Sequence, residues 1–560
     1  MKEFIASLLH NQVPLPVEKI VELIEVPKDA SHGDYAFPCF ILAAQYKKSP
    51  ALIAEELASK LSDIQFEKIE ARGPYINFFV NRSALAQETI HEILSKGDAY
   101  GTSTVGKGKT IVVEFSSPNI AKPFGIGHLR STIIGNALAN IALAQGYKVV
   151  KINYLGDWGT QFGKLMLGYI KWGDQKKLKV QPIHHLLELY VRISQEIKQN
   201  PLLEEEARAW FKKLESGDPK ALRLWKQFRV LSIREFKKIY KELGISFDVL
   251  SGESTYTNKI PAVIETIKKK GLAKKSEGAL VVDLEAHGLG ICLLQKTDGT
   301  TIYASRDIAA AIDRYEQYKF TLMLYEVGAE QKLHFQQFFK VLELLGYSWA
   351  KHCVHVEHGL YLGLDGKKFA TREGKTVFME EVLEETKTLA KKAILAREKV
   401  SATELKKRAS SIARAAIVYG DLKTHRAQNT VFDLERFLAF EGDTGPYLLY
   451  AYARTQSLLM KAKYRRTKKL TIPALNESER HLIFQLGEFP RIVAQAHEAH
   501  APNLLATYAY KLAQAFSEFY HAVKVIGSEQ ETFRLALVDA FSKVLKNALI
   551  LLGITPLKKM

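Results

Sequence analysis

The spacing of apolar and polar residues divides the chain into three parts. Residues 1–100 hold two stretches with helical spacing, 17–25 and 50–61, followed by a strand-like run at 75–80, and so predict a small α+β domain. From 381 to 560, apolar residues recur at helical spacing almost throughout, which predicts an all-α bundle.

The central part, residues 110–380, alternates between short apolar runs and longer helical stretches. This alternation predicts an α/β domain with a doubly wound parallel sheet of the Rossmann type, in which ligands bind at the carboxyl ends of the strands. Charged helical sequence, with a hairpin around 279–283, interrupts it as an insertion at about 165–285. The other expected elements are strands at 110–116, 148–154, 320–325 and 353–356 and helices at 128–145 and 331–345.

The composition favours a polyanionic partner. The 560 residues include 79 Lys and Arg against 61 Asp and Glu, a formal net charge of +18, and each phosphate that such a surface neutralises releases counterions. A generally basic surface that serves solubility explains the same charge, so nucleic acid is one of two interpretations. Three cysteines lie far apart in no metal-binding spacing, which favours the reducing cytoplasm and argues against zinc. Neither a signal peptide nor an apolar run of membrane-spanning length is recognisable, so no membrane association is expected.

The segment 117–131 carries the strongest chemical signal. It follows the first expected strand of the central part and opens into the first expected helix, with Gly125 and Gly127 in the turn. A glycine-containing turn at a helix N-terminus binds phosphate, because free backbone N–H groups and the helix dipole attract negative charge. Lys122 and His128 can both donate to phosphate oxygens, which suits phosphoryl-transfer chemistry better than simple docking of a cofactor.

A second candidate is the basic loop 363–376, which follows the last expected strand and contains Lys368 and Arg372. Taken alone, such a loop would be interpreted as solvated surface. Within a domain whose first turn binds phosphate, a mobile Lys/Arg loop can close on a triphosphate and neutralise charge in the transition state.

These residues resemble the class I aminoacyl-tRNA synthetases and, within them, the arginyl-tRNA synthetase family. Gly125-Ile126-Gly127-His128 is similar to the HIGH signature, and the segment 368–372 is similar to a degenerate KMSKS signature. Further strings typical of the family occur in order at 116–123, 153–163, 303–309, 327–335, 440–447 and 551–556. The resemblance covers the chain from end to end.

Two positions depart from the signatures. Gly125 stands where HIGH places its first histidine, which removes one donor to the nucleotide, and Thr371 stands where KMSKS has its second lysine. The family pattern implies that Lys122 takes the place of that lysine. No residue is identified that would replace the missing histidine.

The resemblance implies a ligase reaction with ATP, Mg²⁺, L-arginine and tRNA(Arg). The arginine carboxylate attacks the α-phosphorus of ATP and releases pyrophosphate, and the 3′-terminal adenosine of the tRNA then accepts arginine. Because the carboxylate is already ionised, the first step needs positioning and charge neutralisation more than acid–base catalysis. The implied catalytic residues are Lys122, His128, Lys368 and Arg372, and no side chain is assigned as a metal ligand. The family also generally needs bound tRNA before it activates the amino acid.

Arginine requires acidic and planar partners, because a guanidinium offers five donors and no acceptor. By the resemblance, Asp307 binds the guanidinium, with Tyr303 one helical turn before it and Gln331 assisting. Glu114 and Asn119 are expected at the ammonium and carboxylate ends of the amino acid.

The residues alone leave alternatives open at several of these positions. Asp307 would more simply be a surface helix carboxylate that pairs with Arg306 or Arg314, and His358 would more often be a structural histidine. The resemblance assigns ATP binding to Gly125, Gly127, His128, His358, Gly359 and Phe369.

For tRNA, the resemblance assigns the D-loop to the first domain, with the strand edge at Tyr75 and Asn77 as a candidate contact. The helical domain is implied to read the anticodon, since unstacked bases stack on aromatic rings and guanidinium planes. The matching positions are Tyr447, Tyr450, Arg454, Tyr520 and Met560. Packing inside a sheet or a helical bundle is the competing explanation for these aromatic residues.

Two other functions stay open, both for a chain expected to be monomeric. Another class I synthetase would differ in the amino acid that drives ATP–pyrophosphate exchange. A catalytically inactive paralogue would bind tRNA without charging it. Gly125 and Thr371 keep that second alternative open, whereas Lys122, His128 and Lys368 argue against it.

Overall fold

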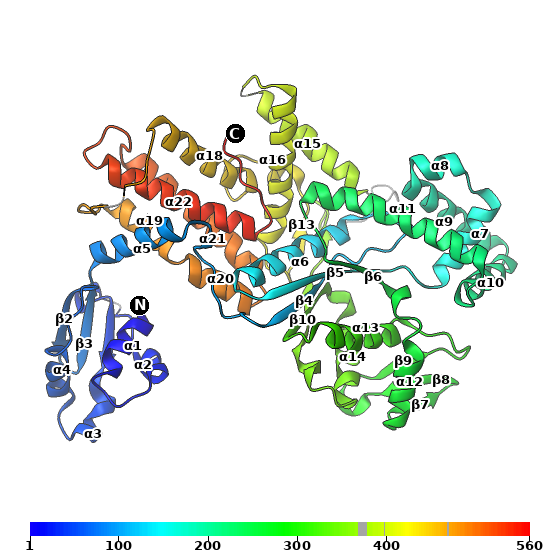
Figure 1. The fold of residues 1–560 in the computed structure, drawn as a ribbon, viewed down its shortest axis with the longest axis horizontal. Helices are drawn as coiled ribbons and strands as arrows, with labels where there is room; N and C mark the ends of the chain where they lie inside the picture. The colour runs from blue at the N-terminus through cyan, green and yellow to red at the C-terminus, as the bar shows by residue number, and fades with distance from the viewer. Residues whose placement is uncertain (28, 368–377, 397, 468–469) are drawn as a thin grey trace. The chain divides into compact units, whose positions relative to one another are not determined.

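The structure is a computed structural model that describes residues 1–27, 29–367, 378–396, 398–467 and 470–560. The chain folds into two compact units (Figure 1). The smaller unit comprises residues 1–100, 458–488 and 514–543. The larger unit comprises residues 101–457, 489–513 and 544–560.

The N-terminal part of the smaller unit is a three-stranded antiparallel sheet covered by helices. The strands β1 (Tyr35–Pro38), β2 (Phe66–Arg72) and β3 (Tyr75–Val80) lie in the order β1-β3-β2. Phe37, Ile76 and Phe78 are fully buried in one apolar core with side chains from the helices. These helices are α1 (Lys2–His10), α2 (Val17–Leu23), α3 (Ala43–Tyr46) and α4 (Pro50–Ala58). The predicted α+β fold of this region is confirmed.

The expectation of a sheet edge at Tyr75 and Asn77 is wrong, because β3 is the middle strand and pairs on both sides. Asn77 is only 3% exposed and therefore offers almost no surface to a tRNA. Tyr75 is half-buried, and its ring centroid lies 5.7 Å from that of the exposed Phe40.

The larger unit is built on a five-stranded parallel sheet, which confirms the doubly wound prediction. Its strands are ordered β11-β10-β4-β5-β6. They span Thr110–Glu114 (β4), Lys148–Leu155 (β5), Val249–Gly252 (β6), Leu322–Gly328 (β10) and Cys353–His358 (β11). The chain runs outward from β4 to β6 and then returns to the other side of β4 with β10. Such a reversal opens a crevice at the carboxyl ends of the two strands, here β4 and β10, where ligands bind.

Helices cover both faces of this sheet, as the doubly wound arrangement requires. Helix α6 (Ile126–Ala144) lies on one side, and α13 (Tyr303–Tyr318) and α14 (Lys332–Leu344) lie on the other (Figure 1). Val112 of β4 and Met323 of β10 share a buried cluster with Ile308 of α13 and Phe338 of α14. The sheet core therefore fixes the ends of all the elements that reach the crevice.

The insertion predicted at about 165–285 is present in two pieces. Five helices separate β5 from β6, and a small antiparallel sheet, which contains the expected hairpin, precedes α13. The helices are α7 (Thr160–Trp172), α8 (Gln175–Val180), α9 (Pro182–Gln199), α10 (Leu202–Glu215) and α11 (Pro219–Leu243). Helix α12 (Ile260–Lys269) leads into β7 (Ala273–Ser276), β8 (Ala279–Asp283) and β9 (Ile291–Gln295).

The C-terminal part is helical, as predicted, apart from the short pairing of β12 (Tyr361–Leu362) with β13 (Thr430–Val431). Its helices include α15 (Met379–Leu395), α16 (Ala402–Leu422), α17 (Leu434–Phe437), α18 (Gly445–Lys461), α20 (Phe489–Glu498), α21 (Pro502–Ala522) and α22 (Glu531–Leu551). The helices α5 (Arg82–Lys96) and α19 (Glu477–Gly487) belong to the smaller unit. None of the helices in the described ranges is both long enough and apolar enough to cross a membrane.

Gly163→Ala is expected to destabilise the inserted helices. The added Cβ would lie 2.1 Å from the carbonyl oxygen of Ala207 in α10, and overpacking of this kind costs about 1–3 kcal/mol. Thermal unfolding followed by circular dichroism should show a lower apparent Tm. Ile170→Ala, at an exposed position of the same helix, is the matched control and should leave the Tm nearly unchanged. An unchanged Tm for Gly163→Ala would contradict the close packing of α7 on α10.

Candidate active site

The turn between β4 and α6 has an unusual backbone that is fixed by side chains. Ser116, Ser117 and Ala121 all have positive φ angles, of 76°, 44° and 59°, and non-glycine residues adopt this region rarely and mainly at functional sites. The amide of Ser116 donates to Ser131 Oγ at 2.9 Å, and the amide of Ala121 donates to Ser232 Oγ at 2.8 Å. The path of the turn is therefore held from α6 and from α11.

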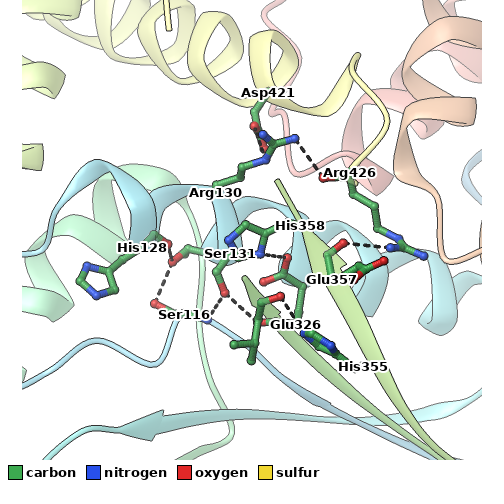
Figure 2. A network of polar contacts seen from close by, with 12 residues as sticks. Ser116, His128, Arg130, Ser131, Glu326, His355, Glu357, His358, Asp421 and Arg426 are labelled. Carbon is green, nitrogen blue, oxygen red and sulfur yellow. Dashed lines mark hydrogen bonds and ion pairs between the residues drawn. The ribbon is translucent and has the colours of Figure 1, made fainter. Parts of the chain in front are cut away.

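His128 lies in the first turn of α6, and its ring nitrogens have distinct roles. The amide of Gly125 donates to Nδ1 at 3.2 Å, so the proton of the neutral ring is on Nε2. Desolvation, together with the charges of Lys122 and His358, lowers the pKa of His128 to about 4. The ring therefore stays a neutral N–H donor at physiological pH. It extends away from Ser116 (Figure 2).

The predicted partner of His128, Lys122, comes from the same turn and is half-buried. Its ammonium lies 5.5 Å from the ring centroid of Tyr190 in α9, so the inserted helices help to place it. Its charge is one cause of the depressed pKa of His128. The structure thus brings together two of the four predicted catalytic residues, whereas Lys368 and Arg372 lie outside the described residues.

The predicted site residue Asn119 is held against the end of β5. The amide of Ile120 donates to the carbonyl of Gly156, and the amide of Gly156 donates to the carbonyl of Pro118, both at 3.2 Å. A Cβ on Gly156 would lie 2.1 Å from Asn119 Oδ1. Only glycine at position 156 therefore leaves room for this asparagine at the crevice.

Glu114, the last residue of β4, is buried and forms an ion pair with Arg314. From the sequence, Arg314 was considered as a partner of Asp307. The Oε2 atom of Glu114 lies 2.5 Å from Nη2 of Arg314 in α13. The guanidinium of Arg314 also lies 5.0 Å from the ring centroid of Tyr154 and 5.8 Å from that of Tyr325. Burial opposes the charge of Arg314, but Glu114 and the surrounding tyrosines outweigh it and hold the arginine pKa well above its usual value. Burial raises the pKa of Glu114, and the charge of Arg314 opposes this increase.

Asp307 faces His334 of α14, which the sequence analysis did not single out. The carboxylate oxygen Oδ2 lies 2.7 Å from His334 Nε2, and the His334 ring meets that of Tyr303 edge-on with centroids 4.7 Å apart. Tyr303 and Asp307 thus share one face of α13, as expected from their spacing. Gln331 is exposed and immediately precedes α14.

The alternative partners of Asp307 are wrong. Arg306 lies 3.5 Å from Glu253, and Arg314 pairs with Glu114. Burial raises the pKa of Glu253 to about 7; the charge of Asp307 contributes to the increase, and Arg306 opposes it. Asp307 likewise acts on Glu114 in the direction that raises its pKa. The three carboxylates are therefore close enough to interact, and they make this part of the crevice strongly acidic.

Of the predicted ATP-binding residues, His358 ends β11 and Gly359 follows it. His358 Nδ1 lies 2.8 Å from an oxygen of Glu326, a fully buried residue of β10 (Figure 2). A Cβ on Gly359 would lie 2.6 Å from the backbone of Gln428. By contrast, a Cβ on Gly125 or Gly127 would meet no atom within 4 Å. Phe369 lies outside the described residues.

Arg130 fastens the phosphate-binding helix to the C-terminal helices. Its guanidinium donates to the carbonyls of Leu360 and Arg426, each at 3.2 Å, and its Nε lies 3.4 Å from Asp421 of α16 (Figure 2). Burial raises the pKa of Asp421 to about 6, while Arg130 opposes this. Arg130 was not predicted as a site residue from the sequence, although it lies only two residues after His128.

The candidate anticodon contacts are divided between the two units, and all except Met560 lie on helices. On α18, Arg454 Nη2 donates to Tyr450 OH at 2.6 Å, and Tyr447 is half-buried with its ring 5.8 Å from that of Tyr510. Tyr520 belongs to the smaller unit and Met560 to the larger, and both are half-buried. Their role in binding tRNA stays a prediction.

His128 is expected to make the stability of the fold depend on pH. Its folded-state pKa of about 4 lies below the ordinary value of 6.5, so the unfolded chain binds the proton more readily between these values. Stability is full above about pH 6.5 and falls as the pH drops toward 4. His128→Gln should therefore show a smaller decrease in Tm between about pH 7 and about pH 5 than the parent protein.

The exposed His287 provides the control for this measurement. His287→Gln should keep the pH dependence of the parent. Burial also lowers the pKa of His500 to about 4, so part of the dependence of Tm on pH remains in every variant. A Tm profile of His128→Gln that coincides with that of the parent would contradict the desolvated state of the ring.

Comparisons with known proteins agree over the whole chain. Family models match as an arginyl tRNA synthetase N terminal domain (residues 1–80), a catalytic domain of "tRNA synthetases class I (R)" (89–434) and a DALR anticodon binding domain (448–560). The arginine–tRNA ligase of Halothermothrix orenii is 44% identical, and the alignment covers 100% of this chain and 99% of that protein. Arginine–tRNA ligase 2 of Bacillus anthracis is 46% identical, with 99% and 98% covered.

Solved structures give the same result. The arginyl-tRNA synthetase of Thermus thermophilus matches with a TM-score of 0.79 at 25% identity and covers 100% of this chain and 99% of its own. A methionyl-tRNA synthetase of Mycobacterium tuberculosis matches with a TM-score of 0.52 at 12% identity, with 80% and 92% covered, and so shares the fold alone. Nothing in these comparisons supports a catalytically inactive paralogue. The chain belongs to the arginyl-tRNA synthetase family of class I aminoacyl-tRNA synthetases.

Proposed function

We propose that this chain is an arginine–tRNA ligase that activates L-arginine with ATP and transfers it to the 3′-terminal adenosine of tRNA(Arg). One observation carries the proposal. The interacting carboxylates of Glu114, Glu253 and Asp307 gather in the crevice that begins with the cationic turn of Lys122 and His128. An acidic place for a guanidinium beside a cationic place for phosphates fits the two substrates of the first step.

Arginine binds through its two cationic ends. Asp307 accepts hydrogen bonds from the guanidinium, with Tyr303 and Gln331 beside it, because a planar cation with five donors needs acceptors at its edge. Glu114 receives the α-ammonium, and Asn119 orients the carboxylate. Arg314, which pairs with Glu114, opposes the burial that raises the pKa of that carboxylate.

Activation then needs little proton transfer. A carboxylate oxygen of arginine attacks the α-phosphorus, and the bond to the pyrophosphate oxygen breaks. Lys122 and the Nε2–H of His128 neutralise the negative charge that develops on the phosphoryl oxygens, at a helix N-terminus that adds free amides. Because its pKa is about 4, His128 donates in the same form throughout the physiological range. Lys368 and Arg372 stay predicted contributors to this charge neutralisation.

The nucleotide and its metal ion fit the same crevice. We place His358 and Gly359 on the adenine side, with Phe369 as a predicted contributor outside the described residues, and Gly125 and Gly127 let the backbone approach the phosphates. We propose that Mg²⁺ arrives on the ATP phosphates, as it does in many such enzymes. Bound there, Mg²⁺ would supply additional neutralisation of phosphate charge.

In the second step the 2′-hydroxyl of the terminal adenosine attacks the carbonyl carbon of the adenylate, and AMP leaves. The half-buried Tyr75 is the proposed D-loop contact, whereas Asn77 is too buried to serve as one. Tyr447, Tyr450, Arg454, Tyr520 and Met560 are the proposed anticodon contacts. We propose a monomer that works in the cytoplasm, where its three buried, unpaired cysteines would remain reduced.

Asp307→Asn is expected to abolish the use of arginine. The substitution removes the negative charge but keeps the size, and polar sites reject mismatched partners by large factors. We expect kcat/KM for arginine in tRNA-dependent ATP–pyrophosphate exchange to fall by at least about 10²-fold, with tRNA affinity near that of the parent. Asp313→Asn is the matched control, since Asp313 lies on the same helix and pairs with Lys259. Parent-like charging by Asp307→Asn would remove Asp307 from the pocket.

Lys122→Ala is expected to act on chemistry and not on recognition of arginine. Loss of one charged donor to the transition state should lower kcat for pyrophosphate exchange by about 10²–10³-fold, with little change in KM for arginine. Lys109→Ala, at an exposed position just before β4, should behave like the parent. Normal exchange by the Lys122 variant would transfer its proposed role to another cation.

A further inference from the structure

His334 touches both groups that we place around the substrate guanidinium. Its Nε2 lies 2.7 Å from Asp307 Oδ2, and its ring lies edge-on to that of Tyr303 with centroids 4.7 Å apart. It also follows the third member of the proposed set, Gln331, by three residues at the start of α14. One imidazole thus connects three elements of the pocket.

The His334 ring is fixed by the aromatic residues that surround it. The His334 side chain is only 10% exposed, and its ring centroid lies 5.5 Å from that of Phe338, which is fully buried in the sheet core. Phe335 lies on another side, with centroids 5.4 Å apart. The position of Nε2 is therefore set by the core of the domain and not by the mobility of a surface side chain.

This hydrogen bond settles which part of Asp307 faces the substrate. A carboxylate has two oxygens with about four acceptor positions, and a neutral imidazole that donates from Nε2 occupies one of them without removing the charge. With Oδ2 held, Oδ1 and the remaining acceptor position of Oδ2 stay available to a planar donor. An Asp307 without this bond could turn on its helix and present either oxygen.

We propose that His334 is a positioning residue of the arginine pocket, which holds the Asp307 carboxylate and the Tyr303 ring so that they accept a guanidinium. The inference rests on the proposed function, because it gives a role to a residue that acts on arginine only through Asp307 and Tyr303. The competing role is a purely structural link between α13 and α14. That link would change stability without changing what the pocket binds.

The test compares variants that keep or lose the donor at the position of Nε2. His334→Leu removes it, whereas His334→Gln places an amide N–H near the same point. His355→Leu is the matched control, because His355 also contacts Phe335, with centroids 4.3 Å apart, but donates to the Val327 carbonyl and not to Asp307. Full-length proteins are assayed by tRNA-dependent ATP–pyrophosphate exchange, and agmatine, which keeps the guanidinium and lacks the carboxylate, serves as a competitive inhibitor.

For His334→Leu we expect KM for arginine and Ki for agmatine to rise together by about 10–100-fold, the range of a lost hydrogen bond to a charged group. The KM for ATP, the Kd for tRNA and kcat at saturating arginine should stay within about 3-fold of the parent. His334→Gln should restore most of the loss, and His355→Leu should leave both constants unchanged.

Three results would overturn the inference. The first is a KM for arginine and a Ki for agmatine within twofold of the parent, whatever the Tm. The second is a rise in the KM for arginine without a rise in the agmatine Ki, which would place the effect at the carboxylate end. The third is an equal loss in His334→Leu and His334→Gln. If the leucine variant does not fold, His334→Asn, which is too short to reach Oδ2, replaces it. A parent protein that does not exchange pyrophosphate with arginine would instead refute the proposed function.

Discussion

Negative charges that gather in a partly buried crevice need partners, and this constraint shapes the whole site. Each of the three interacting carboxylates is held by a different group: Glu114 by Arg314, Glu253 by Arg306 and Asp307 by His334. An isolated buried charge would neutralise itself or destabilise the fold. Because each carboxyl group gives up only part of its acceptor capacity to its partner, acceptor positions remain for the donors of a bound cation.

The partners come mainly from α13, which packs on the same face of the sheet as α14. That helix supplies one of the carboxylates and both of the arginines, so it connects the three carboxyl groups of the acidic half of the crevice. The cationic half of the crevice comes from the turn that follows Glu114, the last residue of β4. Opposite charges are thus separated by the short chain path from the end of β4 to the start of α6, which suits a reaction between a cationic amino acid and a polyanionic nucleotide.

Much of this arrangement was predictable from residue patterns, and the failures have physical reasons. The strands β4, β5, β10 and β11 and the helix α6 were expected close to their observed bounds, because their apolar runs are long and bounded by polar turns. The four-residue strand β6 was missed, since its sequence, Val-Leu-Ser-Gly, is too short to show a period. The edge expected at Tyr75 and Asn77 was wrong because strand order depends on pairing between distant segments.

Within the site, the motifs located the turn and two of the carboxylates, Glu114 and Asp307. Glu253 and His334 were not found, and Arg314 was considered only as a partner of Asp307, because only the fold brings α13, α14 and the segment after β6 together. The spacing of Tyr303 and Asp307 did predict a shared helical face. The alternative pairing of Asp307 with Arg306 or Arg314 was also inferred from closeness along one helix. It is wrong, since both arginines pair with carboxylates from other elements.

Arg130 fixes α6 in a way that ordinary apolar packing would not. Apolar contacts tolerate sliding, but a guanidinium bound to two carbonyls and one carboxylate keeps its direction. Any displacement of α16, or of the loop that carries Arg426, must therefore either pull the first turns of α6 with it or leave a buried cation unpaired. The position of the N-terminal end of α6 therefore depends on the position of the C-terminal helices of its own unit.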